Sequence, residues 1–126
     1  MYLLDTHVFL WWMVTPDKLA KRVRDLMQAN PDRMFFSAVS AWEIAIKSAI
    51  GKLSGVPMSE LVDTVRDQGF VSLPFTGEHA VAVYRLPQHH WDPFDRALVA
   101  QAETEGCKLI SNDKKIAAYA VETLWR

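Results

Sequence analysis

Short runs of apolar residues alternate along the chain with longer segments whose apolar positions recur at helical spacing. The apolar runs are residues 1–4, 34–36, 70–73 and 108–110, and a fifth is expected at 121–125. Short runs that are almost wholly apolar are typical of strands buried on both faces of a parallel sheet. The pattern therefore predicts an α/β fold with helices on both faces of the sheet.

The segments between these runs indicate helices, and several have recognisable ends. We expect helices at 7–13, 17–30, 40–50, 59–68, 78–86, 92–105 and 114–119. Pro31 follows the second, and Gly51, Gly69 and Gly106 follow the third, fourth and sixth, as is common where helices end. The segments between elements are too short to separate domains, so we expect a single domain over residues 1–126.

Composition excludes several classes of protein. The only cysteine, Cys107, precedes a predicted strand, so we expect it to pack in the core, with no disulfide framework and no zinc knuckle. A chain without disulfides suits a reducing, cytoplasmic compartment. The longest apolar run, residues 8–14, is far shorter than the roughly 20 residues that span a bilayer, so we expect no membrane segment.

Four acidic residues lie near the predicted junctions between strands and helices. Asp5 follows the first strand, Glu43 lies early in the helix after the second, and Asp113 follows the fourth. Asp95 lies in the first turn of the helix before that fourth strand. Ligands of such sheets bind beyond the carboxyl ends of the strands. Because clustered carboxylates repel, a divalent cation would hold them together, and oxygen ligands suit magnesium or manganese.

Each acid taken singly also has a structural explanation. Asp5 and Asp113 could cap the helices that follow them, and Asp92 could open a capping box. Glu43 could form an exposed pair with Lys47, one helical turn later. Asp5 argues against a purely structural set, because it directly follows four apolar residues and a part-buried carboxylate needs a partner or a metal.

Four motifs carry a resemblance to a known family. They are Leu3–His7 (LLDTH), Ser37–Lys47 (SAVSAWEIAIK), Asp92–Arg96 (DPFDR) and Ser111–Asp113 (SND). Together they resemble the motifs of PIN-domain ribonucleases, most closely the VapC toxins of type II toxin–antitoxin modules. Two departures are Ser111, where many relatives have threonine, and Trp91, where many have arginine.

The resemblance implies a PIN-like three-layer α/β/α fold with a mostly parallel sheet of about five strands. It also implies a metal-dependent endoribonuclease that hydrolyses RNA phosphodiester bonds with bound Mg²⁺ or Mn²⁺. The implied catalytic and metal-binding residues are Asp5, Glu43, Asp95 and Asp113, with Asp92 as an accessory acid. Thr6 and Ser111 could support the carboxylates. Arg96, next to Asp95, could contact RNA phosphate or be a solvated helix residue.

The implied partners are an RNA substrate, a VapB-like antitoxin and a second copy of the chain. The surplus of apolar residues around Trp11 and Trp12 leaves helix faces for such a partner. The net charge of −1 includes the four proposed acids. Without them, 14 basic residues stand against 11 acidic ones, a net charge of +3 that suits a protein approaching RNA.

Alternatives remain open at this stage. A PIN-domain nuclease in RNA processing and an inactive RNA- or protein-binding module fit the same motifs. A phospho-accepting receiver would need two adjacent acids near the first strand, where Asp5 stands alone. A phosphatase of the haloacid-dehalogenase type would need an acid at His7. No GxxxxGK[ST] phosphate loop is present, so nucleotide hydrolysis is unsupported.

Overall fold

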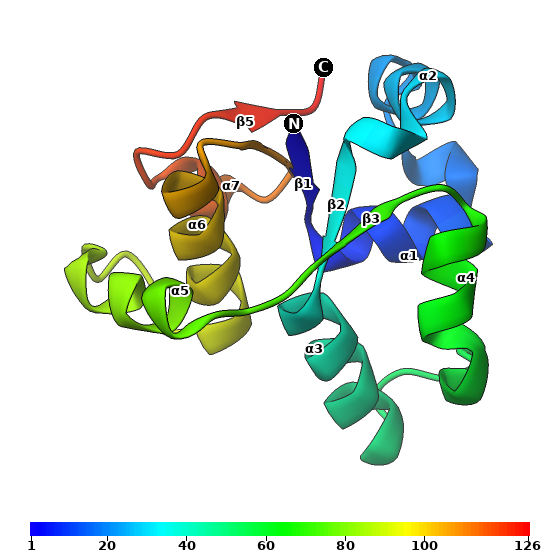
Figure 1. The fold of residues 1–126 in the computed structure, drawn as a ribbon, viewed down its shortest axis with the longest axis horizontal. Coiled ribbons are helices and arrows are strands. Elements are labelled where there is room, and N and C mark those ends of the chain that lie inside the picture. Colours follow the sequence, from blue (N-terminus) through cyan, green and yellow to red (C-terminus); the bar gives the residue numbers. More distant parts are fainter.

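Five parallel strands form the centre of the computed structural model, which describes residues 1–126 (Figure 1). The strands are β1 Tyr2–Leu4, β2 Met34–Ser37, β3 Val71–Leu73, β4 Lys108–Ile110 and β5 Thr123–Leu124. Their order across the sheet is β3-β2-β1-β4-β5, and every neighbouring pair is parallel. The predicted α/β class and five-stranded parallel sheet are confirmed.

Seven α-helices connect the strands. They are α1 Thr6–Val14, α2 Lys21–Ala29, α3 Ala38–Ala49, α4 Leu61–Asp67, α5 Gly77–Ala82, α6 Pro93–Glu105 and α7 Lys114–Ala117. Four 3₁₀ turns supplement them at Pro16–Lys18, Pro31–Arg33, Met58–Glu60 and Val83–Arg85. None of the helices is long and apolar enough to cross a membrane.

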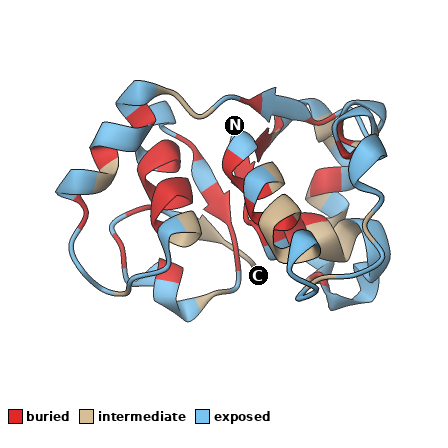
Figure 2. Ribbon diagram, turned by 90° about the horizontal axis from the view of Figure 1, so that it is seen from below, coloured by how far each residue is buried: buried red, intermediate tan, exposed pale blue.

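The helices form two layers, one on each face of the sheet. Because successive strand residues point to opposite faces, Leu3 and Leu109 join one core cluster and Leu4 and Ile110 join the other. The first cluster lies under α5, α6 and α7, and the second under α1, α2 and α4, as the two sides of Figure 1 show. Figure 2 shows the buried residues on the strands and on the helix surfaces turned toward them. The three-layer arrangement is confirmed.

Several predicted helix boundaries are wrong. The helix expected at 17–30 is divided, because Leu19 is extended and only α2 continues. The helix expected to be capped by Ser40 begins three residues earlier, where the Ser37 hydroxyl accepts a hydrogen bond from the Val39 N–H at 3.0 Å. Glu43 therefore lies in the second turn of α3. The 78–86 helix tightens into a 3₁₀ turn after Ala82.

The direction in which the chain builds the sheet reverses at its centre. From β1 the chain adds β2 and β3 on one side, and β4 and β5 later extend the other side. The loops after β1 and β4 therefore leave the sheet in different directions, although the Asp5 N–H still donates to the Ile110 carbonyl at 3.0 Å. Such a switch point is where doubly wound sheets bind ligands.

Candidate active site

Asp5 occupies this switch point and is almost fully buried, at 3% exposure. It stands at the N-cap position of α1, but its side chain makes no capping hydrogen bond. Instead its Oδ2 accepts a hydrogen bond from the Ser111 hydroxyl at 2.8 Å, which joins the loop after β4 to the end of β1. Burial raises the pKa of Asp5, the Ser111 hydrogen bond lowers it, and the charges of Glu43 and Asp113 raise it further.

Glu43 reaches the site from α3 and is equally buried. Its Oε2 lies 2.5 Å from the Lys47 ammonium one helical turn later, and this contact raises the pKa of Lys47. The expected i,i+4 pair exists, but its acid is buried rather than exposed. Oε1 is also buried and has no hydrogen-bond partner. An ionised oxygen in this position needs a cation or a donor that the chain does not supply.

Asp95 lies in the first turn of α6, and its pKa is raised to about 8. Burial is the largest cause, followed by the negative charges of Asp92, Asp5, Asp113 and Glu43. Charges act on one another at this strength only over short distances. The fold therefore brings together acids from positions 5, 43, 95 and 113, which we call the carboxylate cluster.

Asp92 and Asp113 cap helices at the edge of this cluster. Asp92 Oδ1 accepts the Phe94 and Asp95 N–H groups at 2.9 and 3.1 Å, and Asp113 Oδ1 accepts the Lys115 N–H at 2.8 Å. Capping uses one oxygen of each carboxylate and leaves the other free. Both residues therefore cap helices, as the structural explanation predicted, and can still take part in the site.

The carboxylate cluster is not a finished metal cage, because no three of its members converge on one point. Its chemistry nevertheless fits a hydrated divalent ion, since Mg²⁺ keeps several waters and needs only one or two direct carboxylates. Glu43 Oε1 has no hydrogen-bond partner, and burial together with the neighbouring acids raises the pKa of Asp95. A bound cation would stabilise the ionised form of this group.

Two predicted supporting residues differ in what they contact. Ser111 binds a carboxylate directly, and its Oγ also accepts the Asp113 N–H at 3.0 Å, so it orders the loop that carries Asp113. Thr6 contacts no carboxylate. Its hydroxyl lies 2.8 Å from that of Ser40, both buried, and this pair joins the first turn of α1 to the first turn of α3.

The prediction that Arg96 contacts RNA is wrong. Its side chain is buried, at 6% exposure. The guanidinium donates to the Pro87 carbonyl at 2.8 Å, to the Tyr119 hydroxyl at 3.1 Å and to the Val83 carbonyl at 3.3 Å. A guanidinium engaged in this way holds the loop before α6 and is not available to a phosphate.

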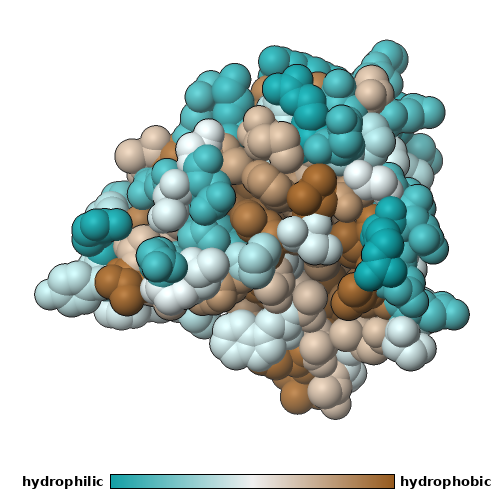
Figure 3. Space-filling view, viewed as in Figure 1, coloured by the Kyte–Doolittle hydropathy of each residue, from teal (hydrophilic) through white to brown (hydrophobic).

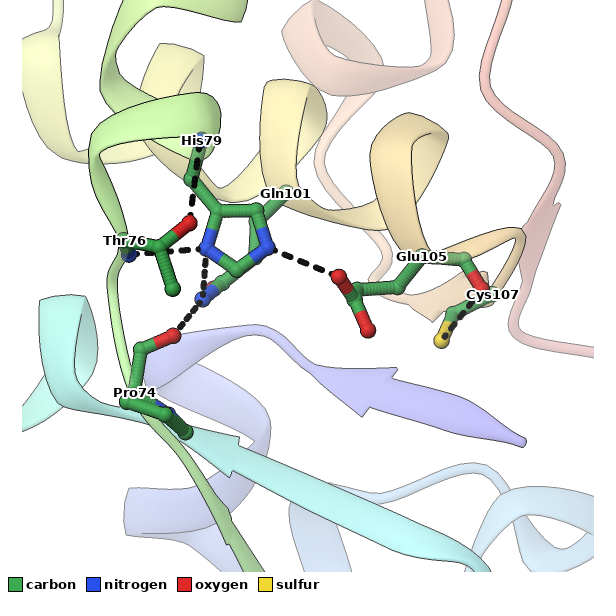
Figure 4. Close-up of polar contacts among 6 residues, drawn as sticks. All are labelled: Pro74, Thr76, His79, Gln101, Glu105 and Cys107. Atoms are coloured by element: carbon green, nitrogen blue, oxygen red, sulfur yellow. Dashed lines mark hydrogen bonds and ion pairs between the residues drawn. The ribbon is translucent and has the colours of Figure 1, made fainter.

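His79 belongs to a second buried polar group, on α5 and α6 (Figure 4). A backbone N–H can only donate, so Nδ1 accepts from the Thr76 N–H at 3.0 Å. The proton then lies on Nε2, which donates to Glu105 at 2.9 Å, and the Gln101 amide also approaches Nδ1 at 3.4 Å. We call these residues the His79 cluster. Since both ring nitrogens have partners, neither is free for a metal.

Cys107, beside the His79 cluster in Figure 4, is buried as expected. Burial raises the pKa of its thiol, which keeps it protonated and unreactive.

A cavity of about 290 Å³ adjoins Glu43 between α1 and the end of α3. Lys47, Lys52 and His7 supply its cationic and imidazole groups, and Leu10, Ile44 and Leu53 its apolar wall. The sequence reasoning treated Lys47 only as a partner of Glu43 and missed Lys52. The sequence feature that could have indicated Lys52 is Gly51, which ends the helix and so determines the direction of the next residue.

Comparison with known proteins covers almost the whole chain. The family model of the PIN domain matches residues 2–122. Ribonuclease VapC22 of Mycobacterium tuberculosis is 30% identical over 125 residues, covering 93% of this chain and 90% of that protein. Two solved structures share the fold at 14% identity. VapBC2 from Rickettsia felis, bound to a DNA fragment from its promoter, has a TM-score of 0.70 and covers 99% of this chain and 98% of its own. DNA-bound VapBC from Salmonella typhimurium has a TM-score of 0.71, with 98% and 96% covered.

Proposed function

The chain belongs to the PIN domain family, and from that premise we propose that it is a metal-dependent endoribonuclease of the VapC type. It acts as the toxin of a toxin–antitoxin module, in the cytoplasm, with residues 1–126 forming one PIN domain. The observation that carries the proposal is the carboxylate cluster at the switch point of the sheet, where the negative charge exceeds what the chain neutralises.

Asp5, Glu43, Asp95 and Asp113 would hold Mg²⁺ or Mn²⁺, directly or through waters. When bound, the ion lowers the pKa of a water and stabilises charge on the phosphate. Ser111 orients Asp5 by its hydrogen bond, as partners of metal ligands commonly do. Asp92 and Asp113 hold the N-termini of α6 and α7 at the site through their capping bonds. The N-terminus of the longer helix, α6, would then direct its partial positive charge toward a phosphate.

Apolar surface supports a role for protein partners. A hollow between α1 and α4 is lined mainly by hydrophobic residues, among them Leu10, Met13 and Val56, and would receive an apolar segment of a VapB-like antitoxin. Figure 3 shows further hydrophobic surface at the centre of the face that carries β3, with hydrophilic side chains toward its edges. Exposed apolar patches of this kind mark interaction sites. Val81 and Tyr84, exposed at 73% and 91% around the end of α5, would pack in a homodimer.

The test is cleavage of single-stranded RNA by the purified chain in Mg²⁺ or Mn²⁺, with Asp5→Asn and Asp95→Asn as variants. The parent should cleave only with metal, and both variants should be inactive while keeping the parent's circular dichroism. Cleavage by either folded variant at the parent's rate would show that the site is misassigned. Growth arrest on induced expression, relieved by the product of a neighbouring gene, would support the toxin role.

A further inference from the structure

The C-terminus of α3 places two lysines side by side. After Ala49, Gly51 adopts φ +78°, a left-handed conformation that glycine favours. The Gly51 N–H then donates to the Ser48 carbonyl at 3.3 Å, and the Lys52 N–H to the Lys47 carbonyl at 2.9 Å. These are the two bonds of a Schellman motif, whose corresponding positions frequently carry an apolar pair. Here both positions are lysine, so the turn brings together two positive charges.

Both lysines line the cavity beside the carboxylate cluster. Lys47 is paired with Glu43, whereas Lys52 forms no ion pair. Two ammonium groups and the His7 ring therefore face one carboxylate in a space of about 290 Å³. Glu43 offsets the charge of Lys47, so the exposed Lys52 leaves the cavity with a positive charge that an anion could neutralise. Glu43 cannot satisfy both, because Lys47 already holds its Oε2.

We propose that this cavity binds a backbone phosphate of the RNA strand, next to the phosphate that is cleaved, through Lys52 and Lys47. The inference rests on the proposed ribonuclease function. Glu43 borders both the cavity and the carboxylate cluster, so a strand lying across the acids continues into the cavity. The two ammonium groups match one phosphate, and Leu10, Ile44 and Leu53 offer a wall for the adjoining sugar.

RNA suits the cavity better than an acidic protein segment does. Carboxylates of a peptide would lie beside Glu43, Asp5 and Asp95 with no cation of their own to offset the repulsion. RNA substrate is positioned together with the divalent ion at the carboxylate cluster, so its phosphates meet a site whose negative charge is already reduced.

The test compares Lys52→Glu with Lys108→Glu. The second variant makes the same charge change at the amino-terminal end of β4, away from the cavity. Lys108 is half-exposed and pairs only with Glu122 at the surface. Both are made in an Asp95→Asn background to prevent cleavage, and a short fluorescein-labelled single-stranded RNA is the probe. Lys52→Glu should raise its Kd about tenfold, while Lys108→Glu, as a distant surface charge, should change it less than about twofold. Lys52→Ala should reduce the slope of log Kd against log salt by about 0.7, the value for one lost contact to a single strand.

Further measurements separate the cavity from the metal site. In the otherwise unaltered chain, Lys52→Ala should raise KM for RNA more than it lowers kcat and should leave Mn²⁺ binding unchanged.

Equal weakening of RNA binding by Lys52→Glu and Lys108→Glu would show that only the net charge of the protein matters, and would overturn the proposal. So would unchanged RNA binding together with weaker binding of an acidic peptide. If the parent cleaves RNA and Lys52→Glu binds it normally, only the cavity proposal fails. If the parent neither binds nor cleaves RNA, the ribonuclease proposal fails with it.

Discussion

The carboxylate cluster and the His79 cluster both contain buried polar side chains, but the two clusters satisfy them differently. In the His79 cluster each ring nitrogen has a partner of suitable character, and the one polar atom without a partner is the neutral Gln101 Oε1. In the carboxylate cluster an ionisable oxygen, Glu43 Oε1, has none, and Asp95 is surrounded by like charges.

The difference is the one expected between a structural polar group and the proposed metal site. A group that serves only the fold gains nothing from leaving a charge unpartnered, because that costs free energy in a low dielectric. A site that must bind a cation and an anionic substrate cannot satisfy itself completely beforehand. The carboxylate cluster should therefore reduce the stability of the metal-free chain, and the His79 cluster should increase it.

Asp95→Asn should produce the largest effect. Removing one of the proposed metal ligands should lower the rate of RNA cleavage about a thousandfold, since metal-derived stabilisation of the transition state amounts to several kcal/mol. The same change should raise the free energy of unfolding of the metal-free chain, because it removes a carboxyl group whose pKa burial and the neighbouring acids raise above its unfolded value. Cleavage assays and urea unfolding check the two effects, with the exposed Asp67→Asn as control. A less stable Asp95→Asn variant would contradict the comparison.

His79→Leu should have the opposite profile. The change leaves the Thr76 N–H without its acceptor and removes the contact with Glu105, whereas the Gln101 amide keeps its bond to the Pro74 carbonyl. An unsatisfied buried group costs about 1–3 kcal/mol. We expect a loss of about 2 kcal/mol in the free energy of unfolding, measured in urea, with RNA cleavage per folded molecule unchanged. A fall in kcat without a fall in stability would place His79 in the catalytic machinery instead.

The sequence predicted the strands more accurately than the helix ends, and the site role of the acids stays a prediction. Apolar runs locate β1, β2, β3 and β4 because burial on both faces leaves little choice of residue. Asp5 and Asp113 were singled out because they follow such runs, and Glu43 and Asp95 because they lie early in predicted helices. The start of α3 was missed because Ser37 and Ser40 are both possible caps, and only tertiary structure engages Ser40 with Thr6.

Arg96 and Lys52 show what the sequence could not provide. From the sequence, Arg96 beside Asp95 could equally bind a phosphate or hold a neighbouring loop in place. The choice depends on where the carbonyls of Val83, Leu86 and Pro87 lie, which local sequence does not specify. Lys52 was missed because its place at the cavity follows from the backbone turn at Gly51 and not from any motif.

Ser111→Ala refines the comparison within the carboxylate cluster. The Ser111 hydroxyl is the one donor side chain that contacts Asp5, so its removal should weaken Mn²⁺ binding about tenfold, at the lower end of the effect of altering groups that orient metal ligands. Isothermal titration calorimetry measures the change, and the exposed Ser54→Ala is the matched control. Unchanged affinity would mean that burial alone orients Asp5.

The last prediction concerns the dependence of stability on pH. The pKa of Asp95 is about 8 in the folded chain, above its usual value near 4, so between these limits the folded state binds the proton more tightly than the unfolded state. Stability of the metal-free chain should therefore fall as pH rises from about 4 to 8, and Asp5, with its raised pKa, should add to the trend. Saturating Mg²⁺ should flatten the slope. Thermal melts across pH with EDTA or Mg²⁺ check this, and a rising slope in EDTA would contradict it.

The pairing of β1 with β4 has a consequence for the order of events during synthesis. Asp5 leaves the ribosome early, but its neighbours on β4 and in the loop to Asp113 emerge about a hundred residues later. A nascent or truncated polypeptide that ends before Lys108 has three of the four acids but lacks the strand that joins them. The proposed cleavage centre would therefore form only when translation is nearly complete, and incomplete products should not cleave the RNA of the ribosome that makes them.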